Sequence, residues 1–381
     1  MGNLTRRQIL LGGGAIVGAG LAPVIPATTG SSALGLISTA LGADIPKPDQ
    51  PIRLSANENP YGPSRVALKA IAANMHLTNR YADEPAATEL VNIFAKLNNV
   101  PSDHVMTTTG SSEVLNVAGM LAGLRTGSVV CADPTYQSLL RYAENAGVEI
   151  IRIPVNEGLN ADLDAMRRAV RSDTAMVYIV NPNNPIPSVI EKNAMKEFVL
   201  EMSQGRLVFV DEAYHEFVDN PDYESMIGLI AQGHNNIIVS RTASKIHGLA
   251  GMRVGFGISH PDLINEMTMR RTGDNNVLGL KAAIASYQDE EFQNFSRRKN
   301  KESLAITEGM CEDLGIRYAK SNTNFTFIET GVENSVVQER MLEHGIMTGR
   351  LFPPFTTWSR ISMSTPEHMK YFVQVFRQEF A

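Results

Sequence analysis

Short, largely apolar runs recur along the first two thirds of the chain, and most are continuous rather than alternating with polar positions. The runs lie at 105–108, 127–132, 149–154, 175–180, 207–210 and 237–239. Strands that are apolar throughout suit a parallel sheet covered by helices on both faces. Apolar residues with helical spacing lie between several of these runs, at 112–124 and 139–146. The same spacing occurs at 84–98, before the first run. We therefore predict an α/β fold with a mostly parallel, doubly wound sheet in a large domain.

A different pattern begins after Asn276, where longer helical segments dominate. Helical spacing runs through 280–290, 292–314, 336–344 and 368–380, and short strands are expected at 325–328 and 360–363. We predict that 276–381 form a smaller α+β domain and that 76–275 form the large domain. Residues 44–75 begin with a stretch rich in Pro and Asn, and we expect them to form an N-terminal arm.

The first 43 residues have the features of an export signal. The pair Arg6-Arg7 precedes a weakly apolar run rich in glycine, which is typical of a twin-arginine signal. We expect the chain to reach the periplasm through the twin-arginine export machinery. Cleavage after Ala27 or near Ala40 to Ala43 fits the sequence, and an uncleaved membrane anchor is the alternative. This route carries folded proteins, which suits an enzyme that takes up its cofactor before export.

Composition narrows the class of protein. Of the 381 residues, 43% are apolar and 19% charged, as in an ordinary soluble globular protein, and the length allows two domains. The net charge of −6 gives no basic footprint for nucleic acid, so we expect no such partner. Cys131 lies in an apolar strand far from Cys311, which favours a buried free thiol over a disulfide.

Lys245 is the residue with the clearest chemical implication. It follows the apolar run at 237–239 and lies among small residues, with hydroxyls at Thr242 and Ser244 and with Arg253 eight positions later. A lysine held in such a setting can lose its proton and form a Schiff base with a carbonyl compound. The alternative is a solvated lysine on a surface loop, and the neighbouring motifs decide against it.

Two further sites follow predicted strands, at the edge where an open α/β sheet binds its ligands. Ser111 and Ser112 open a helix directly after Gly110, so their N–H groups and hydroxyls suit a phosphate; an ordinary helix cap is the alternative. Tyr136 follows the strand 127–132, where its ring can stack on a flat heterocycle or simply pack against the protein.

Two more sites follow the strands 175–180 and 207–210. Asn184 lies in a stretch of Asn and Pro that is also typical of a turn. Asp211 stands at a buried strand end, where its charge needs a partner such as a protonated pyridine nitrogen; a helix cap is the alternative. Glu212 and His215 have the spacing of half a carboxylate-bridged metal site, but no second copy occurs, so we expect no metal.

The order of these sites resembles that of fold-type I pyridoxal-phosphate aminotransferases, and most of all that of the histidinol-phosphate aminotransferase family. The resemblance covers roughly residues 50–375. Its motifs are Leu54-Ser-Ala-Asn-Glu-Asn-Pro-Tyr-Gly-Pro-Ser64, Arg80-Tyr-Ala-Asp83, Asp211-Glu-Ala-Tyr-His-Glu-Phe217 and Ser244-Lys-Ile-His-Gly-Leu-Ala-Gly-Met-Arg-Val-Gly255.

The resemblance implies a role for each matching residue. Lys245 would carry pyridoxal 5'-phosphate as a Schiff base and move the proton, and Asp211 would pair with the ring nitrogen. Asn184 and Tyr214 would bond the ring oxygen, and Tyr136 would stack on the ring. The phosphate would be held by Ser111, Ser112, Thr242, Ser244 and Arg253, with Tyr81 reaching in from the partner subunit of a homodimer. Arg360 would bind the substrate carboxylate or phosphate, and Tyr61 and Arg350 would line the substrate pocket.

The resemblance also implies an enzyme that moves an amino group from an amino acid or related amine to a 2-oxo acid. Three departures from the family pattern stand out: Ile186-Pro187 replaces Thr-Gly, His247 replaces a common aromatic ring, and 272–277 lacks a Pro-Phe pair. We expect these near the substrate, and an exported enzyme has little use in histidine synthesis, so we expect a donor other than histidinol phosphate. A decarboxylase of the same family and an exported, non-catalytic binding protein are the alternatives.

Overall fold

The computed structural model describes residues 47–81 and 84–381. All the described residues belong to one compact unit of the chain. The predicted export signal at 1–43 therefore lies outside the described residues. Within the described part, no helix combines the length and the apolar character needed to span a membrane.

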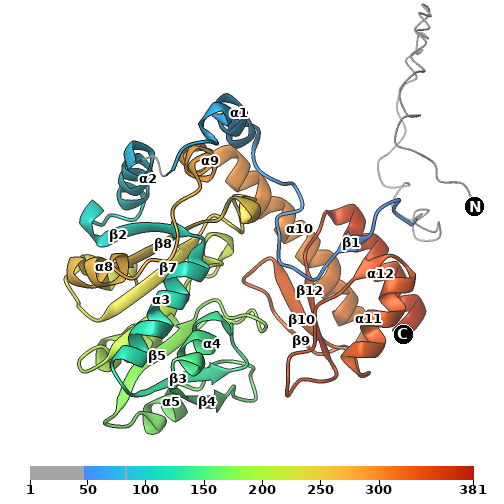
Figure 1. Ribbon diagram of the computed structural model, residues 1–381. Coiled ribbons are helices and arrows are strands. Elements are labelled where there is room, and N and C mark those ends of the chain that lie inside the picture. The colour runs from blue at the N-terminus through green and yellow to red at the C-terminus, as the bar shows by residue number, and fades with distance from the viewer. Residues whose placement is uncertain (1–46, 82–83) are drawn as a thin grey trace, which may run out of the picture. The chain divides into compact units, whose positions relative to one another are not determined.

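The main sheet of the large domain has the strand order β2-β8-β7-β6-β5-β3-β4 (Figure 1). Its strands are β2 (Val105–Thr109), β3 (Ser128–Asp133), β4 (Glu149–Pro154), β5 (Thr174–Val180), β6 (Leu207–Asp211), β7 (Ile237–Thr242) and β8 (Val254–Ser259). The strands from β4 to β7 are mutually parallel, whereas β8 is antiparallel to both β7 and β2. The predicted mostly parallel sheet is confirmed.

Helices cover both faces of this sheet, as its apolar strands predict. Along β5, Val177 and Ile179 lie in one core, whereas Met176 and Tyr178 lie in the other, so successive side chains pack under different helical layers. One face is covered by α3 (Ser111–Leu124), α4 (Ser138–Asn145) and α8 (Pro261–Thr268). The other is covered by α2 (Glu84–Leu97), α5 (Leu163–Ala169), α6 (Lys192–Met202), α7 (Ile227–Ala231) and α9 (Val277–Tyr287).

The small domain is built on an antiparallel sheet of order β12-β10-β9. Its strands are β9 (Tyr318–Ala319), β10 (Phe325–Glu329) and β12 (Trp358–Ser362), and its helices are α10 (Glu290–Leu314), α11 (Asn334–Glu343) and α12 (Pro366–Phe380). β1 (Ile52–Arg53) of the N-terminal arm pairs with β11 (Ile346–Met347), whereas α1 (Arg65–Ala73) lies against α9 (Figure 1). The arm thus connects the two domains.

The structure moves the domain boundary that we predicted at residue 276. In α9, Leu280 and Ala283 lie in the same core as Phe256 of β8, so this helix belongs to the large domain. α10 then runs on to the small-domain core, which contains Leu304 and Met310. A helical pattern does not reveal which core its apolar face packs against, so pattern alone places the boundary too early.

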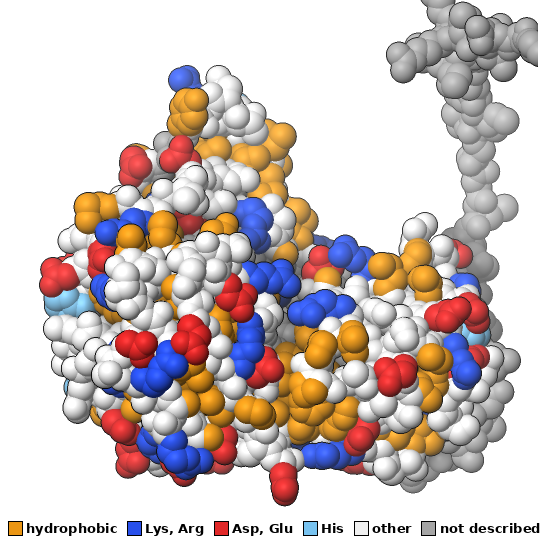
Figure 2. Space-filling view, turned by 60° about the horizontal axis from the view of Figure 1, so that its bottom comes forward, with side chains coloured by type: hydrophobic (Ala, Val, Ile, Leu, Met, Phe, Trp, Pro, Cys, Tyr) orange, Lys and Arg blue, Asp and Glu red, His pale blue; other side chains and the backbone are white. Residues whose placement is uncertain are grey.

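Charged side chains of both signs lie on the face seen in Figure 2. Acidic, basic and apolar side chains are mixed over most of this face, but Lys and Arg side chains gather near its middle, where the surface is hollowed. The chain as a whole carries a net charge of −6. A local excess of positive charge on an acidic protein favours anionic ligands there.

Candidate active site

A cavity of about 310 Å³ lies where β6 and β7 end and α3 begins. It is lined by Ala56, Asn57, Ser111, Ser112, Tyr136, Val180, Asn184, Asp211, Ala213, Tyr214, Thr242, Ser244, Lys245, Ala250, Arg253 and Arg360. The predicted cofactor residues other than Tyr81 therefore come together at the carboxyl edge of the parallel strands. Arg360 comes from β12 of the small domain, so both domains contribute to the site.

The start of α3 suits a phosphate group. Its N-cap is Gly110 at φ 74°, and no side chain caps the helix, so the first N–H groups have no side-chain acceptor. Arg253 places a guanidinium nitrogen 3.5 Å from Ser112 Oγ, and the hydroxyls of Thr242 and Ser244 lie 2.9 Å apart in the same cavity. Free N–H groups at a helix start beside a cation are what a phosphate dianion requires.

The ordinary helix cap that we considered for this site is absent from α3. The nearby acid, Glu113, is buried and accepts hydrogen bonds from the backbone N–H groups of Thr109, Thr272 and Gly273. It therefore ties the loop at 272–273 to the end of β2 and leaves the start of α3 open.

Two glycines allow the backbone to pack closely around this helix start. A Cβ atom on Gly255 of β8 would lie 2.2 Å from the backbone nitrogen of Ser111, and one on Gly110 would lie 2.3 Å from the Arg253 guanidinium. The Ser111 backbone cannot give way, so Gly255 is required for β8 to run directly beside the first turn of α3. The flexible Arg253 side chain can move away from Gly110, where the positive φ of 74° is the reason for glycine.

Asp211 ends β6 with its side chain almost fully buried. Its Oδ1 accepts a hydrogen bond from Ser240 Oγ at 2.8 Å, and the N–H of Ala213 also favours the charged form. Burial outweighs both and raises the pKa of Asp211 to about 6. Such a carboxylate is stabilised by a cation, and a protonated pyridine nitrogen is a suitable one. Sequence reasoning missed Ser240, whose contact depends on the pairing of Asp211 with Ser240 across β6 and β7.

The amine of Lys245 is held inside the same cavity. Its Nζ donates to the backbone oxygen of Asn57 at 3.2 Å and lies 5.4 Å from the centre of the Tyr214 ring. Burial, together with the positive charge of Arg360, lowers the pKa of Lys245 to about 8, although Asp211 acts in the opposite direction. A larger share of this amine is therefore neutral near pH 8 than for an exposed lysine, as a nucleophile requires.

A network of side chains joins Tyr214 to the small domain. The Tyr214 hydroxyl accepts from Asn57 Nδ2 at 3.0 Å and from Asn184 Nδ2 at 3.3 Å. Arg360 donates to Asn184 Oδ1 at 2.9 Å. Burial raises the pKa of Tyr214 to about 12, so its hydroxyl stays protonated and can donate to a ligand. Asn57 was missed in the sequence because an Asn in an extended arm gives no chemical signal.

Arg360 and Arg350 lie on one aromatic ring. The guanidinium carbon of Arg360 lies 5.1 Å from the centre of the Phe352 ring, and that of Arg350 lies 4.2 Å from it. Arg360 is buried and its Nε has no hydrogen-bond partner among the described residues, whereas Arg350 is exposed and does not line the cavity. Arg360 can therefore receive an anionic group inside the cavity, while the substrate role of Arg350 stays a prediction.

The structure does not bring Tyr61 or Tyr81 into this cavity. The Tyr61 ring packs edge-on against Phe295 with centroids 4.9 Å apart, and its hydroxyl is buried with no hydrogen-bond partner in residues 47–81 and 84–381. Tyr81 is 90% exposed on this protomer. A substrate role for Tyr61 and a phosphate role for Tyr81 across a dimer both stay predictions.

The departures from the family pattern that we expected near the substrate do not line the cavity. Ile186 is buried in a cluster with Phe327 and Trp358 of the small domain. His247 is buried and stacks on Tyr287 with centroids 3.9 Å apart, so it occupies the place of an aromatic ring. These substitutions lie in the packing behind the site. Because they do not line the cavity, they do not exclude any particular amino donor.

The residues present fit pyridoxal phosphate. The uncapped start of α3 with Arg253 suits the phosphate, the buried carboxylate of Asp211 suits the ring nitrogen, and Lys245 offers an amine with a lowered pKa. In the described part of the chain, no group of three or more His, Cys, Asp and Glu side chains is placed to hold a metal ion.

The chain belongs to the aminotransferase class I and II family, whose model matches residues 49–376. It is a pyridoxal-phosphate-dependent aminotransferase of fold type I.

Among its relatives is histidinol-phosphate aminotransferase 1 of Nitrosococcus oceani, which is 32% identical over 329 residues, covering 85% of this chain and 87% of the relative. A candidate histidinol-phosphate aminotransferase of Erwinia carotovora atroseptica has a structure with a TM-score of 0.83 and 34% identity, covering 86% of this chain and 95% of its own. The histidinol-phosphate aminotransferase of Sinorhizobium meliloti, solved in complex with pyridoxal-5'-phosphate, gives a TM-score of 0.79 at 26% identity, covering 86% and 91%.

Proposed function

We propose that Lys245 is the amine that condenses with the cofactor aldehyde and that a 2-oxo acid accepts the amino group from the donor. The observation that carries the proposal is the position of Lys245. Its Nζ lies in one cavity with the carboxylate of Asp211, the open start of α3 and the Arg360 guanidinium. No other lysine lines this cavity.

Each residue of the cavity then has a physical task. When bound, pyridoxal phosphate supplies an aldehyde for amines and a ring that takes up the electrons released at the donor Cα. Asp211 would hold a proton on the ring nitrogen, and Arg360 would orient the donor by its carboxylate or phosphate. Lys245 Nζ, neutral once displaced by the donor amine, takes the Cα proton and later returns it.

Borohydride reduction tests the role of Lys245. The reduced cofactor should stay attached to the tryptic peptide that contains Lys245, as mass spectrometry would show. Lys245→Ala should remove this label and lower kcat by several orders of magnitude, because both the nucleophile and the base are lost. Lys96→Ala, a change at an exposed position on α2, serves as the matched control and should leave both readouts unchanged. A label that persists in Lys245→Ala would overturn the proposal.

The reaction is tested with a panel of amino donors paired with 2-oxoglutarate or pyruvate. Transamination releases the oxo acid of the donor and forms a new amino acid from the acceptor. Release of CO₂ without amino transfer would instead identify a decarboxylase. Histidinol phosphate belongs in the panel as the donor that the names of the relatives indicate. We propose that another amino acid or amine is preferred, because an exported enzyme has little use in histidine synthesis.

We also propose that residues 1–43 direct export through the twin-arginine route and that the enzyme works as a homodimer. The support for export is the Arg6-Arg7 pair before a glycine-rich apolar run. Replacing both arginines by lysine should keep the protein in the cytoplasmic fraction of an expressing cell, as an immunoblot of fractions would show. An unchanged periplasmic fraction would count against this route.

A further inference from the structure

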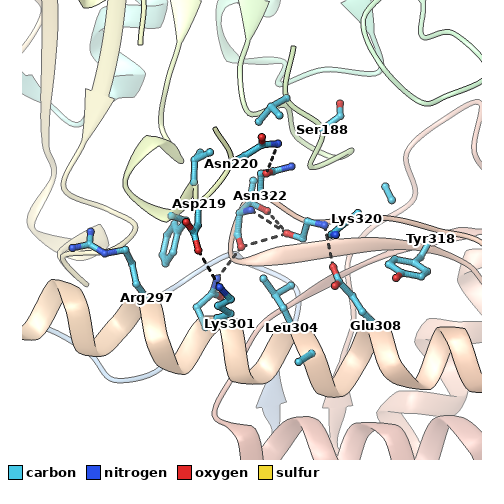
Figure 3. A pocket seen from close by; sticks show the side chains of 18 of the residues that line it. Ser188, Asp219, Asn220, Arg297, Lys301, Leu304, Glu308, Tyr318, Lys320 and Asn322 are labelled. Atoms are coloured by element: carbon cyan, nitrogen blue, oxygen red, sulfur yellow. Dashed lines mark hydrogen bonds and ion pairs between the residues drawn. The ribbon is translucent and has the colours of Figure 1, made fainter. Parts of the chain in front are cut away.

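A second and larger cavity lies away from the residues around Lys245. It has a volume of about 1290 Å³, and its walls come from both domains (Figure 3). One wall is a face of α10 with Arg297, Lys301 and Glu308, and the opposite wall includes Asp219 and Asn220 of the large domain. Apart from Phe217 and Asn300, which also line a small cavity beside Tyr61, its residues line no other described cavity. We call it the interdomain groove.

The interdomain groove is rich in positive charge. The basic residues that line it are Arg297, Arg298, Lys301, Arg317 and Lys320, whereas its acidic residues are only Asp219 and Glu308. This excess contrasts with the net charge of −6 of the whole chain. Burial raises the pKa of Glu308, whereas the Ser321 N–H, which bonds one of its oxygens at 3.0 Å, and the charge of Lys320 act in the opposite direction, so this carboxyl group offsets part of the excess.

The existing contacts leave much of this positive charge available. Lys301 pairs with Asp219 at 3.0 Å, but both side chains are largely exposed, and such pairs contribute little to stability. Within the described ranges 47–81 and 84–381, Arg298 and Lys320 form no ion pair and no side-chain hydrogen bond. The groove therefore holds cations that a ligand can engage without breaking buried interactions.

The cations come from two separate segments. Arg298 and Lys301 lie on α10, whereas Lys320 lies on the loop between β9 and β10, which contacts α10 at Glu308 (Figure 3). Ser321, the neighbour of Lys320, is bonded to Glu308, which lies seven positions and about 10 Å along α10 from Lys301, so one anionic group does not reach both segments. Asn220 and Asn322, which are bonded to each other at 3.4 Å, add amide groups between them.

We propose that the interdomain groove binds a small polyanion, a molecule that carries at least two phosphate or carboxylate groups. One anionic group contacts Arg298 and Lys301, and another contacts Lys320. The volume is about four times that of the cavity around Lys245, so an organic molecule of several such groups fits. This site is separate from the proposed chemistry of Lys245, and its test does not depend on that chemistry.

Calorimetric titration of the holoenzyme tests the proposal, with pyrophosphate as the phosphate probe and citrate as the carboxylate probe. Binding should occur at low ionic strength, weaken as NaCl is added, and leave the visible absorption of the bound cofactor unchanged. Whichever probe binds more tightly identifies the anionic group. Absence of binding for both probes, or binding that changes the cofactor absorption, would overturn the proposal.

Three variants make the test specific. Arg298→Gln with Lys320→Gln should weaken the binding about tenfold, because two ligand contacts are lost. Lys96→Gln with Arg168→Gln removes the same charge from exposed positions outside the groove and should leave binding unchanged. Asp219→Asn removes a competing carboxylate, frees Lys301, and should tighten binding about twofold to fivefold. Equal weakening in both double variants would show a nonspecific effect of net charge and contradict the site.

Discussion

At the scale of single residues, the proposed Schiff-base role of Lys245 predicts how cofactor uptake depends on pH. Its pKa is lowered to about 8, from the usual value of 10.5, first by burial and then by the charge of Arg360. Because only the neutral amine attacks a carbonyl, the rate of cofactor uptake by the apoenzyme should rise about tenfold per pH unit below pH 8 and level off above it. Stopped-flow absorption after mixing with pyridoxal phosphate measures this profile.

The pH profile of cofactor uptake also tests whether the charge of Arg360 lowers the pKa of Lys245. Arg360→Gln removes a positive charge that disfavours the protonated amine, so the midpoint should move to higher pH. Arg340→Gln, a change at a surface position on α11, should leave it in place. A wild-type midpoint near 10.5 would show that Lys245 behaves as a solvated lysine.

Ser240 tunes the other charged group of the site. Its hydroxyl donates to Asp211 Oδ1 and lowers the pKa of that carboxyl group. Burial acts in the opposite direction and is stronger, so the resulting pKa of Asp211 is about 6. In Ser240→Ala that pKa should rise further, by up to about one unit, because the carboxylate loses a donor. The carboxylate form is lost as pH falls through the pKa, so the acid limb of kcat/KM should move to higher pH.

A second buried serine controls for the loss of packing. Ser259 is also fully buried, but its hydroxyl donates to the backbone oxygen of Ile237 and not to a carboxylate. Ser259→Ala should lower stability about as much as Ser240→Ala while leaving the pH profile unchanged. Identical profiles in both variants would reduce Ser240 to a structural role.

At the scale of elements, continuous apolar runs were enough to predict the parallel strands and the ends where the site forms. These runs did not predict β8 (Val254–Ser259), because Gly255 and Gly257 interrupt the series of apolar side chains by which a buried strand is recognised. They also could not identify Ser240 or Asn57, whose contacts come from strand register and from the path of the arm. A sequence motif identifies candidate site residues, whereas the packing of distant segments determines which other residues contact them.

Gly255, one of the two glycines that make β8 hard to recognise in the sequence, is also required where β8 passes the start of α3. In Gly255→Ala the new methyl group would lie 2.2 Å from the Ser111 nitrogen, so the start of α3 must move. We expect cofactor affinity to fall at least tenfold, because the phosphate N–H donors shift. Gly309→Ala on α10, where a Cβ meets nothing within 4 Å, should instead be neutral or stabilise by about 1 kcal/mol. Equilibrium dialysis and thermal unfolding measure the two effects.

At the scale of the whole molecule, the two domains are joined directly behind the active site. Ile186 and Leu159 of the large domain pack with Phe327, Phe352 and Trp358 of the small domain. The segment that contains Ile186 begins at Asn184, which accepts the hydrogen bond from Arg360. The same stretch therefore contacts Arg360, the predicted substrate-binding arginine, and packs against the small domain outside the cavity.

The predicted role of Tyr81 in binding the cofactor phosphate requires a second subunit. It is 90% exposed and absent from the cavity of its own protomer, so its predicted phosphate contact can only be made across a homodimer. Tyr81→Ala should weaken cofactor affinity about tenfold, and Lys245→Ala should be inactive. When the two variants are unfolded and refolded together, mixed dimers contain one site with Lys245 from one protomer and Tyr81 from the other. Activity at limiting cofactor should therefore recover in the mixture beyond the sum of the separate variants, whereas a purely additive result would place Tyr81 outside the site.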